Sequence, residues 1–291
     1  MIACSIDTWF ALIPYNYRMQ TQAEKAKRFQ ELHRRPGAFL IPNPWDVGSA
    51  RLLARLGFEA LATTSVGYAF SVGRRDHGVS RDEMIAHAAA IVAATDLPVS
   101  ADLENGFGDD PDTVATTVRM AAEAGLAGCS IEDSTNRSGE AIYAFDHAVD
   151  RVRAAVAAAR ALSVPFTLTA RAENYLHGRP DLRDTIARLT AFQDAGADVL
   201  YAPGLTSIDD IAVLVKSVDR PVNALAGMQG VHFRLDALAK AGVKRVSVGG
   251  ALSRVALAAF LGAATEMRDH GTFSFVDTPF TSRQIADMFD A

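Results

Sequence analysis

Short apolar segments alternate with longer amphipathic segments along most of the chain. Residues 45–57 and 111–125 have the spacing of amphipathic helices, and the second follows a helix start signal at Asp110 and Pro111. Several helical segments end at a glycine, where a left-handed backbone is favoured. Eight apolar segments predict strands, at residues 38–42, 59–65, 98–104, 128–133, 165–171, 198–203, 221–225 and 245–250.

This alternation predicts an α/β fold, a (β/α)8 TIM barrel. The alternative is an open doubly wound sheet, but the segment IPNPWDVGSA after the first strand does not match the dinucleotide-binding pattern GxGxxG. No linker, repeat or low-complexity segment interrupts the pattern, so we interpret residues 26–291 as one barrel domain with a C-terminal helical tail. Residues 1–25 are interpreted as an N-terminal extension, either disordered or a consequence of start-site choice with Met19 as the true start.

Composition narrows the class of protein. The chain has 291 residues, of which 49% are hydrophobic and 22% are charged, a balance typical of globular proteins. The net charge of -5 argues against nucleic acid or an anionic membrane as a partner. The two cysteines, Cys4 and Cys129, fit a reducing cytoplasm. The N-terminal residues lack the basic region of a signal peptide, and no apolar run reaches the length of a membrane span. We therefore expect a cytoplasmic protein.

The segment PVSADLENGFG places two carboxylates at the end of the third predicted strand. Asp102 and Glu104 are two positions apart, so in an extended strand they point to the same face. Buried like charges that converge need a cation between them if both are to stay ionised. In a barrel the carboxyl ends of the strands form the active-site face, so this pair predicts a metal site.

Other strand ends add polar groups to the same face. The predicted strands and the loop GRRDHG contribute Asp76, Glu132 with Asp133, Arg171 with Glu173, Asn223 and Arg254. Carboxylate oxygens gathered on one side suit Mg2+. An arginine opposite them suits a substrate carboxylate, which it can bind through a bidentate fork.

Five strand-end motifs, SADLENGFG, GCSIEDS, TARAENYL, GADVLYAPG and PVNALAG, resemble those of the isocitrate lyase/phosphoenolpyruvate mutase superfamily over residues 38–270. The resemblance implies a barrel that depends on Mg2+, with Mn2+ as an alternative, and that forms or consumes a metal-stabilised enolate. The implied substrate is a small 2-oxo or 2-hydroxy carboxylic acid. The resemblance also implies a homodimer or homotetramer in which subunits exchange the last barrel helix.

The same resemblance implies roles for individual residues. Asp102 is the closest metal ligand, and Glu104, Glu132 and Asp76 hold metal-bound waters. Arg171 binds the substrate and, with Glu132 and Ser138, completes the catalytic set. Further substrate contacts are expected from Ser65, Val66 and Gly67, whose backbone N–H groups would face the oxyanion, and from Asn223 and Arg254.

Two departures from the family pattern affect the expected chemistry. Glu104 stands where many relatives have aspartate, so direct and water-mediated ligation can exchange. The lid loop reads NRSGE where isocitrate and methylisocitrate lyases have K-R-C-G-H, which puts Ser138 in place of the acidic cysteine and Glu140 in place of histidine. A serine hydroxyl is a far weaker acid than a thiol. We expect residues 134–143 to form a mobile lid in which Ser138 is not an essential acid.

These observations favour a lyase that cleaves a C–C bond next to a 2-oxo acid carboxylate. The alternatives are a phosphonoenolpyruvate mutase-type P–C rearrangement and a catalytically silent 2-oxo acid-binding protein.

Each motif also has a structural interpretation. Glu132–Asp133 can cap the following helix, and Arg171–Glu173 can form an ion pair at the barrel edge. Asp76 can be a turn former with His77 as its solvated neighbour, and Cys129 is expected in the core.

Overall fold

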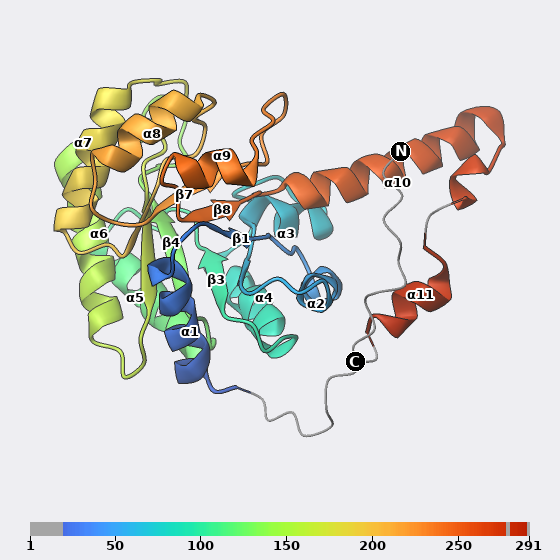
Figure 1. Cartoon of the computed structure of the whole chain (residues 1–291), viewed down its shortest axis with the longest axis horizontal. Coiled ribbons are helices and arrows are strands. Elements are labelled where there is room, and N and C mark those ends of the chain that lie inside the picture. Colours follow the sequence, from blue (N-terminus) through green and yellow to red (C-terminus); the bar gives the residue numbers. More distant parts are fainter. Residues whose placement is uncertain (1–19, 278–279, 290–291) are drawn as a thin grey trace.

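The computed structural model describes residues 20–277 and 280–289 and contains a barrel of eight parallel strands (Figure 1). The strand order is β1-β8-β7-β6-β5-β4-β3-β2, so strands β2 to β8 pair with their neighbours in the chain, and the first strand pairs with the last. Between β1 and β2 the Ala62 N–H donates to the Pro42 carbonyl at 3.1 Å, which nearly closes the barrel. The strands are β1 Phe39–Ile41, β2 Leu61–Ala62, β3 Val99–Asp102, β4 Gly128–Glu132, β5 Thr167–Arg171, β6 Val199–Tyr201, β7 Val222–Leu225 and β8 Arg245–Ser247.

The eight predicted strands and the (β/α)8 barrel are confirmed, and helices cover the outside of the barrel. Helix α1 spans the boundary expected after residue 25, and residues 1–19 of the expected extension lie outside the described residues. The helices are α1 Gln22–Arg34, α2 Val47–Arg55, α3 Ser65–Ser71, α4 Arg81–Ala93, α5 Pro111–Glu123, α6 Phe145–Arg160, α7 Leu182–Asp194, α8 Ile208–Lys216, α9 Leu235–Lys240, α10 Ala251–His270 and α11 Ser282–Asp287, with the short 3-10 helix η2 Ser274–Val276.

Alternation along the strands separates two environments. Cys129 and Ile131 of β4 pack in an apolar cluster with the surrounding helices, as expected for Cys129. Ser130 and Glu132 lie at the alternate positions, which point to the opposite face. Because neighbouring strands are in register, with Glu132 opposite Arg171, the polar positions of successive strands meet inside the barrel. The sequence therefore builds a polar interior inside an apolar shell.

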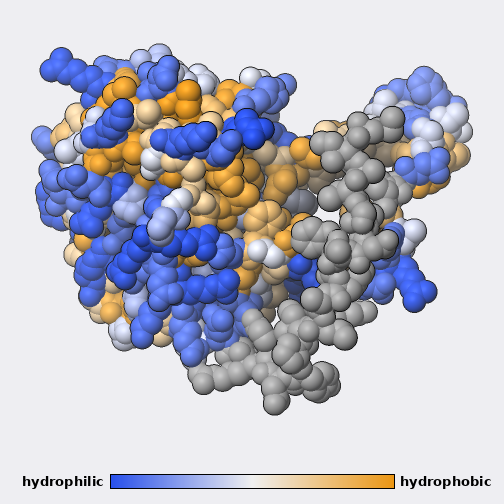
Figure 2. All heavy atoms as spheres, viewed as in Figure 1, coloured by the Kyte–Doolittle hydropathy of each residue, from blue (hydrophilic) through white to orange (hydrophobic). Residues whose placement is uncertain are grey.

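Helix α10 forms an arm that extends away from the barrel (Figure 1). Of its 20 residues only Ser253 is buried. Large apolar side chains on it are exposed, including Val255 at 67%, Phe260 at 66% and Leu261 at 60% of their surface, and Figure 2 shows apolar surface along this arm. Across residues 20–277 and 280–289, no helix is both long enough and apolar enough to cross a membrane.

Candidate active site at the carboxyl ends of the strands

Arg171, at the end of β5, lies among three carboxylates. Its Nη1 is 2.9 Å from Asp102 Oδ1 and 3.2 Å from Glu132 Oε2, and its Nη2 is 2.8 Å from Glu173 Oε1. The predicted strand-end groups on β3, β4 and β5 therefore come together. We call Asp76, Asp102, Glu104, Glu132, Arg171 and Glu173 the acidic rim cluster.

Asp102 joins this cluster to the start of helix α3. Its Oδ2 accepts hydrogen bonds from the Ser65 backbone N–H at 3.3 Å and from the Ser65 hydroxyl at 3.1 Å. Its other oxygen accepts from Arg171. One carboxylate thus connects the predicted backbone-donor loop to the predicted substrate-binding arginine.

The loop at residues 64–67 is held by close packing. The Gly67 N–H donates to the hydroxyl of the helix cap Thr64 at 3.3 Å, so the expected donors at Ser65 and Gly67 both have acceptors within the protein. A Cβ on Gly67 would lie 2.5 Å from Thr64 Cγ2 and 3.0 Å from Trp45 Cβ, so only glycine fits here. Val66 follows Ser65 in the first turn of α3.

Asp76, His77 and Glu104 form one side of the acidic rim cluster. His77 Nδ1 lies 3.0 Å from Glu104 Oε2, and His77 Nε2 lies 3.9 Å from Asp76 Oδ2. His77 and Glu104 both have a left-handed backbone, with φ of 60° and 49°. His77 is exposed, as in the structural interpretation of this loop, but its ring also contacts the buried Glu104 carboxylate.

Burial raises the pKa of several carboxyl groups in the cluster. The pKa of Glu132 lies well above its usual value because of burial, which nearby Arg171 only partly offsets. Burial also raises the pKa of Glu104, against the effect of His77, and that of Asp76. For Arg171, burial favours a lower pKa, but its three carboxylate partners outweigh burial and raise the pKa. The cluster holds five carboxyl groups beside a single arginine, and burial favours the neutral form of three of them.

The donor atoms of the cluster fit a divalent cation. Oxygen ligands from Asp102, Glu104, Glu132 and Asp76 are of the kind that Mg2+ and Mn2+ prefer. Glu104 Oε1 is buried and has no hydrogen-bond partner, so it is free to accept a cation or a metal-bound water. Leaving such an oxygen without any partner costs about 1–3 kcal/mol or more. The arrangement therefore fits the predicted metal role.

Asn223 of β7 is buried and is held by hydrogen bonds to β8. Its Nδ2 donates to Ser247 Oγ at 3.0 Å, and its Oδ1 accepts from Arg245 Nε at 2.8 Å. Arg245 also donates to Thr169 Oγ1 of β5 at 3.0 Å, which links β8 to β5 through the barrel interior. Both hydrogen-bonding ends of the Asn223 amide thus have partners within the protein.

Arg254, in the first turn of α10, binds the loop after β7. Its Nη2 donates to the Gly227 carbonyl at 2.6 Å. Among the described residues, no contact between Arg254 and the acidic rim cluster is recorded. The structure does not bring this predicted substrate residue to the carboxylates.

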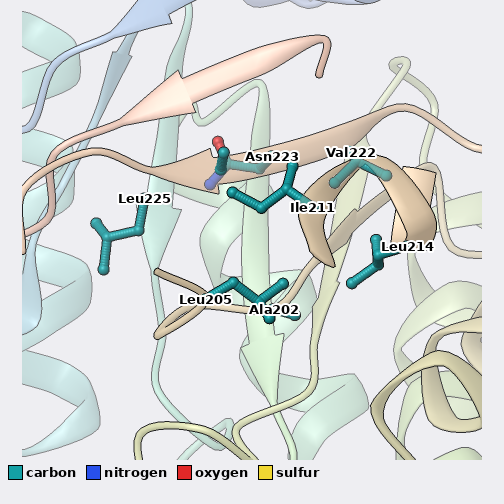
Figure 3. Close-up of a pocket in the computed structure, with 8 residues that line it drawn as sticks. Ala202, Leu205, Ile211, Leu214, Val222, Asn223 and Leu225 are labelled. Carbon is teal, nitrogen blue, oxygen red and sulfur yellow. The ribbon is translucent and has the colours of Figure 1, made fainter. Parts of the chain in front are cut away.

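A small cavity lies between β7, helix α8 and the segment after β6 (Figure 3). It is lined by apolar side chains such as Ile211 and Leu214, with Asn223 at its edge, and has a volume of about 10 Å³. That is at most enough for one water molecule. It is too small for a carboxylic acid substrate.

The predicted lid begins directly after β4. A bridge between Ser134 and Ile142 closes the loop, and Arg137 pairs with Asp109 of the loop after β3. Ser138 is exposed at the tip of this loop. The predicted lid is thus attached to the loop after β3 as well as to the end of β4, and the mobility predicted for it stays a prediction.

The alternative helix-cap interpretation of Glu132 and Asp133 is wrong. Helix α6 begins only at Phe145 and has no side-chain cap. Asp133 instead accepts from Arg188 Nη1 at 2.9 Å and from the Glu173 N–H at 2.8 Å. By contrast, the ion pair between Arg171 and Glu173 is present, but as part of a larger cluster.

Sequence reasoning missed His77 and Arg245. The motif GRRDHG contains His77 beside the predicted ligand Asp76, and that adjacency is the signal that was available. Arg245 is the first residue of β8, and nothing in its local pattern distinguishes it from a surface arginine.

Comparison with known proteins gives matches along most of the chain. The family model of phosphoenolpyruvate phosphomutase matches residues 29–268. A crystal structure of a protein from Burkholderia cenocepacia, provisionally assigned as a lyase/mutase, is 64% identical, with a TM-score of 0.91 and coverage of 93% of this chain and 98% of that chain.

Two relatives of named activity are more distant. A 2-methylisocitrate lyase from Halalkalibacterium halodurans is 28% identical over 262 residues, covering 87% of this chain and 85% of the relative. The structure of oxaloacetate acetylhydrolase with its product oxalate is 27% identical, with a TM-score of 0.83 and coverage of 93% of this chain and 95% of that chain. The chain therefore belongs to the phosphoenolpyruvate phosphomutase family, within the isocitrate lyase/phosphoenolpyruvate mutase superfamily.

Proposed function

We propose that the protein is a divalent-metal-dependent lyase that cleaves a C–C bond of a small 2-oxo or 2-hydroxy carboxylic acid. One observation carries this proposal: the Asp102 carboxylate joins Arg171 to the Ser65 donors at the carboxyl ends of the strands. Two relatives of named activity, a 2-methylisocitrate lyase and an oxaloacetate acetylhydrolase, support the substrate class.

In this proposal the residues of the acidic rim cluster have two roles, binding of the metal ion and binding of the substrate. Asp102, Glu104, Glu132 and Asp76 hold the ion, which supplies Lewis-acid stabilisation of the enolate charge when bound. Arg171 binds and orients the substrate carboxylate, and this needs one of its present carboxylate partners to turn toward the ion instead.

Donors near Ser65 stabilise negative charge that develops on the substrate oxygen. The α3 cap and the close packing of Gly67 hold the backbone of this loop, and the Ser65 donors become available to the substrate when Asp102 turns toward the ion. The buried Asn223 amide, held by Arg245 and Ser247, contributes a fixed dipole below the reacting group.

The test is a screen of 2-oxo and 2-hydroxy diacids for Mg2+- or Mn2+-dependent release of pyruvate or oxalate, with Asp102→Ala beside the wild type. We expect the variant to lose divalent-ion binding by calorimetry while its circular dichroism stays native. Asp82→Ala is the matched control, because Asp82 is 81% exposed and lies outside the cluster. Unchanged ion binding in Asp102→Ala would place the metal elsewhere.

A phosphonopyruvate arm of the screen distinguishes a second reaction. The matching family model is that of a phosphomutase, and Ser138 provides no thiol acid, so a P–C rearrangement is the nearest alternative. Turnover of the phosphonate alone would favour it. Binding of 2-oxo acids with no product in any arm would indicate a catalytically silent binding protein.

We also propose that the α10 arm packs against a second copy of the chain. Its exposed apolar side chains would be buried if each subunit packed its last helix against the partner subunit. Sedimentation at micromolar concentration is expected to show a dimer or tetramer, and Phe260→Glu is expected to shift it toward monomer. A monomeric wild type would rule this out.

A further inference from the structure

Arg171 also contacts an aromatic ring, that of Tyr201. Its Cζ lies 5.0 Å from the centroid of this ring, within the range at which an aromatic face attracts a guanidinium. The contact follows from the fold, because Arg171 of β5 and Tyr201 of β6 are paired in the sheet. Their side chains therefore extend to the same face at the same level, and Tyr201 is buried there.

Tyr201 is held at both ends. Its backbone carbonyl accepts from the Ala172 N–H at 2.9 Å, so it is bound to the residue that follows Arg171. Its hydroxyl interacts with Ser247 of β8, and Ser247 Oγ accepts from the buried Asn223 amide at 3.0 Å. The ring is thus a fixed surface beside the guanidinium.

Tyr201 differs from the other partners of Arg171 in how it attracts the guanidinium. Carboxylates occupy its N–H groups: Nε and Nη2 are directed at Glu173, and Nη1 is directed at Asp102 and Glu132. An aromatic face attracts the positive charge through its electron density and leaves those N–H groups free. A carboxylate partner therefore competes with a substrate carboxylate for the N–H groups of Arg171, whereas the ring does not.

We propose that Tyr201 is a positioning residue, which holds the guanidinium of Arg171 by its ring face while the N–H groups of Arg171 bind the substrate carboxylate. The attraction to the ring remains when the rim carboxylates turn toward a cation, so Arg171 stays in place for the substrate. This inference rests on the substrate-binding role of Arg171 in the proposed function, and it adds the residue that determines where this arginine lies.

The experiment measures two dissociation constants by calorimetry, for Mg2+ and then for oxalate added to the Mg2+-loaded protein. Tyr201→Leu removes the ring, so oxalate binding should weaken about tenfold or more, while Mg2+ affinity stays within about twofold of the wild type. Tyr201→Phe keeps the ring, so its oxalate affinity should stay within about threefold of the wild type. Circular dichroism checks that the variants fold.

The matched control is Phe192→Leu. Phe192 of α7 is fully buried in an apolar cluster, so this change removes a ring of similar size without touching the acidic rim cluster. Both dissociation constants should equal those of the wild type.

A second variant tests the ring face without a change of shape. Pentafluorophenylalanine at position 201 has nearly the shape of phenylalanine, but its fluorines withdraw electron density from the face that attracts a cation. Oxalate binding should be about tenfold or more weaker than in Tyr201→Phe. This comparison decides the question if Tyr201→Leu does not fold.

The outcomes separate this inference from the proposed function. The role of Tyr201 is overturned if the pentafluorophenylalanine variant binds oxalate as tightly as Tyr201→Phe does, or if Tyr201→Phe is as weak as Tyr201→Leu. It is also overturned if Phe192→Leu shows the same loss, or if Tyr201→Leu loses Mg2+ binding as well. These results leave the lyase proposal standing, whereas a wild type that binds no oxalate in the presence of Mg2+ contradicts both.

Discussion

Two arginines occupy the barrel interior in opposite electrostatic settings. Arg171 contacts three carboxylates, and they raise its pKa despite burial. Arg245 is equally enclosed but donates only to the neutral oxygens of Asn223 and Thr169, and burial lowers its pKa to about 10. Among the described residues no carboxylate forms an ion pair with Arg245, and its Nη1 has no partner.

From the charges around each arginine we infer that the two have different roles. The acidic rim cluster has more carboxyl groups than arginines, so a bound cation would favour their ionised forms and would release Arg171 to a substrate. On the side of Arg245 the unpaired charge is positive and immobile, since hydrogen bonds tie it to two strands. Arg171 can therefore change its ion-pair partners, whereas Arg245 is held in place by hydrogen bonds between strands.

The sharpest test of this contrast replaces each arginine by methionine. Arg171→Met leaves three buried carboxylates without their cation and should lower the free energy of unfolding by about 3–5 kcal/mol. Arg245→Met leaves only neutral acceptors unpaired and should cost about 1–3 kcal/mol. Urea denaturation at pH 7 and fixed protein concentration measures both. Equal losses would mean that the two environments do not differ as described.

The pH dependence of stability gives the next effect. Burial, then the charge of Arg245, lowers the pKa of His33 to about 3, and Lys244 acts in the same direction. Because this pKa lies below the unfolded value of 6.5, the folded state resists protonation and stability is lost as the pH falls below 6.5. Between pH 6.5 and 5 this group should remove about 1.6 kcal/mol.

Arg245→Met should raise the pKa of His33 and flatten this loss, as followed by imidazole NMR titration and urea denaturation. His87 provides the internal control, because burial lowers its pKa to about 4 without a contribution from Arg245. A His33 pKa that does not move would show that Arg245 exerts no field across the interior.

The smallest effect is expected at the lid. Ser138 is exposed and belongs to neither arginine's surroundings, so Ser138→Ala should lower turnover tenfold or less, about 1.4 kcal/mol of barrier. Loss of a proton donor would cost 10²–10⁴-fold instead. Turnover as low as that of Arg171→Met would mean that Ser138 acts as the acid.

The fold and most of the acidic rim cluster could be predicted from the sequence. Once eight strand–helix units are recognised, topology alone brings the ends of β3, β4 and β5 together, and so Asp102, Glu132 and Arg171. This needs no knowledge of loop conformation. The order of the strands in the sequence is therefore enough to predict which residues meet at the rim.

Loop geometry and buried arginines could not be predicted in this way. The contact between His77 and Glu104 depends on left-handed backbone at both residues, which the period of the pattern does not encode. Arg151 of α6 donates to the carbonyls of the loop after β3, such as that of Asn105, across 46 positions of sequence. An arginine in an amphipathic helix looks the same whether it faces solvent or such a loop.

The left-handed backbone of Glu104 has a consequence for how this sequence can change over evolutionary time. A non-glycine residue at φ of 49° carries a cost of about 1–3 kcal/mol, which glycine would remove. A lineage that no longer used the rim would gain stability by drifting to glycine at this position. Retention of glutamate in descendants of this chain would therefore be a heritable sign that the site is in use, and its replacement by glycine would date the loss of the activity.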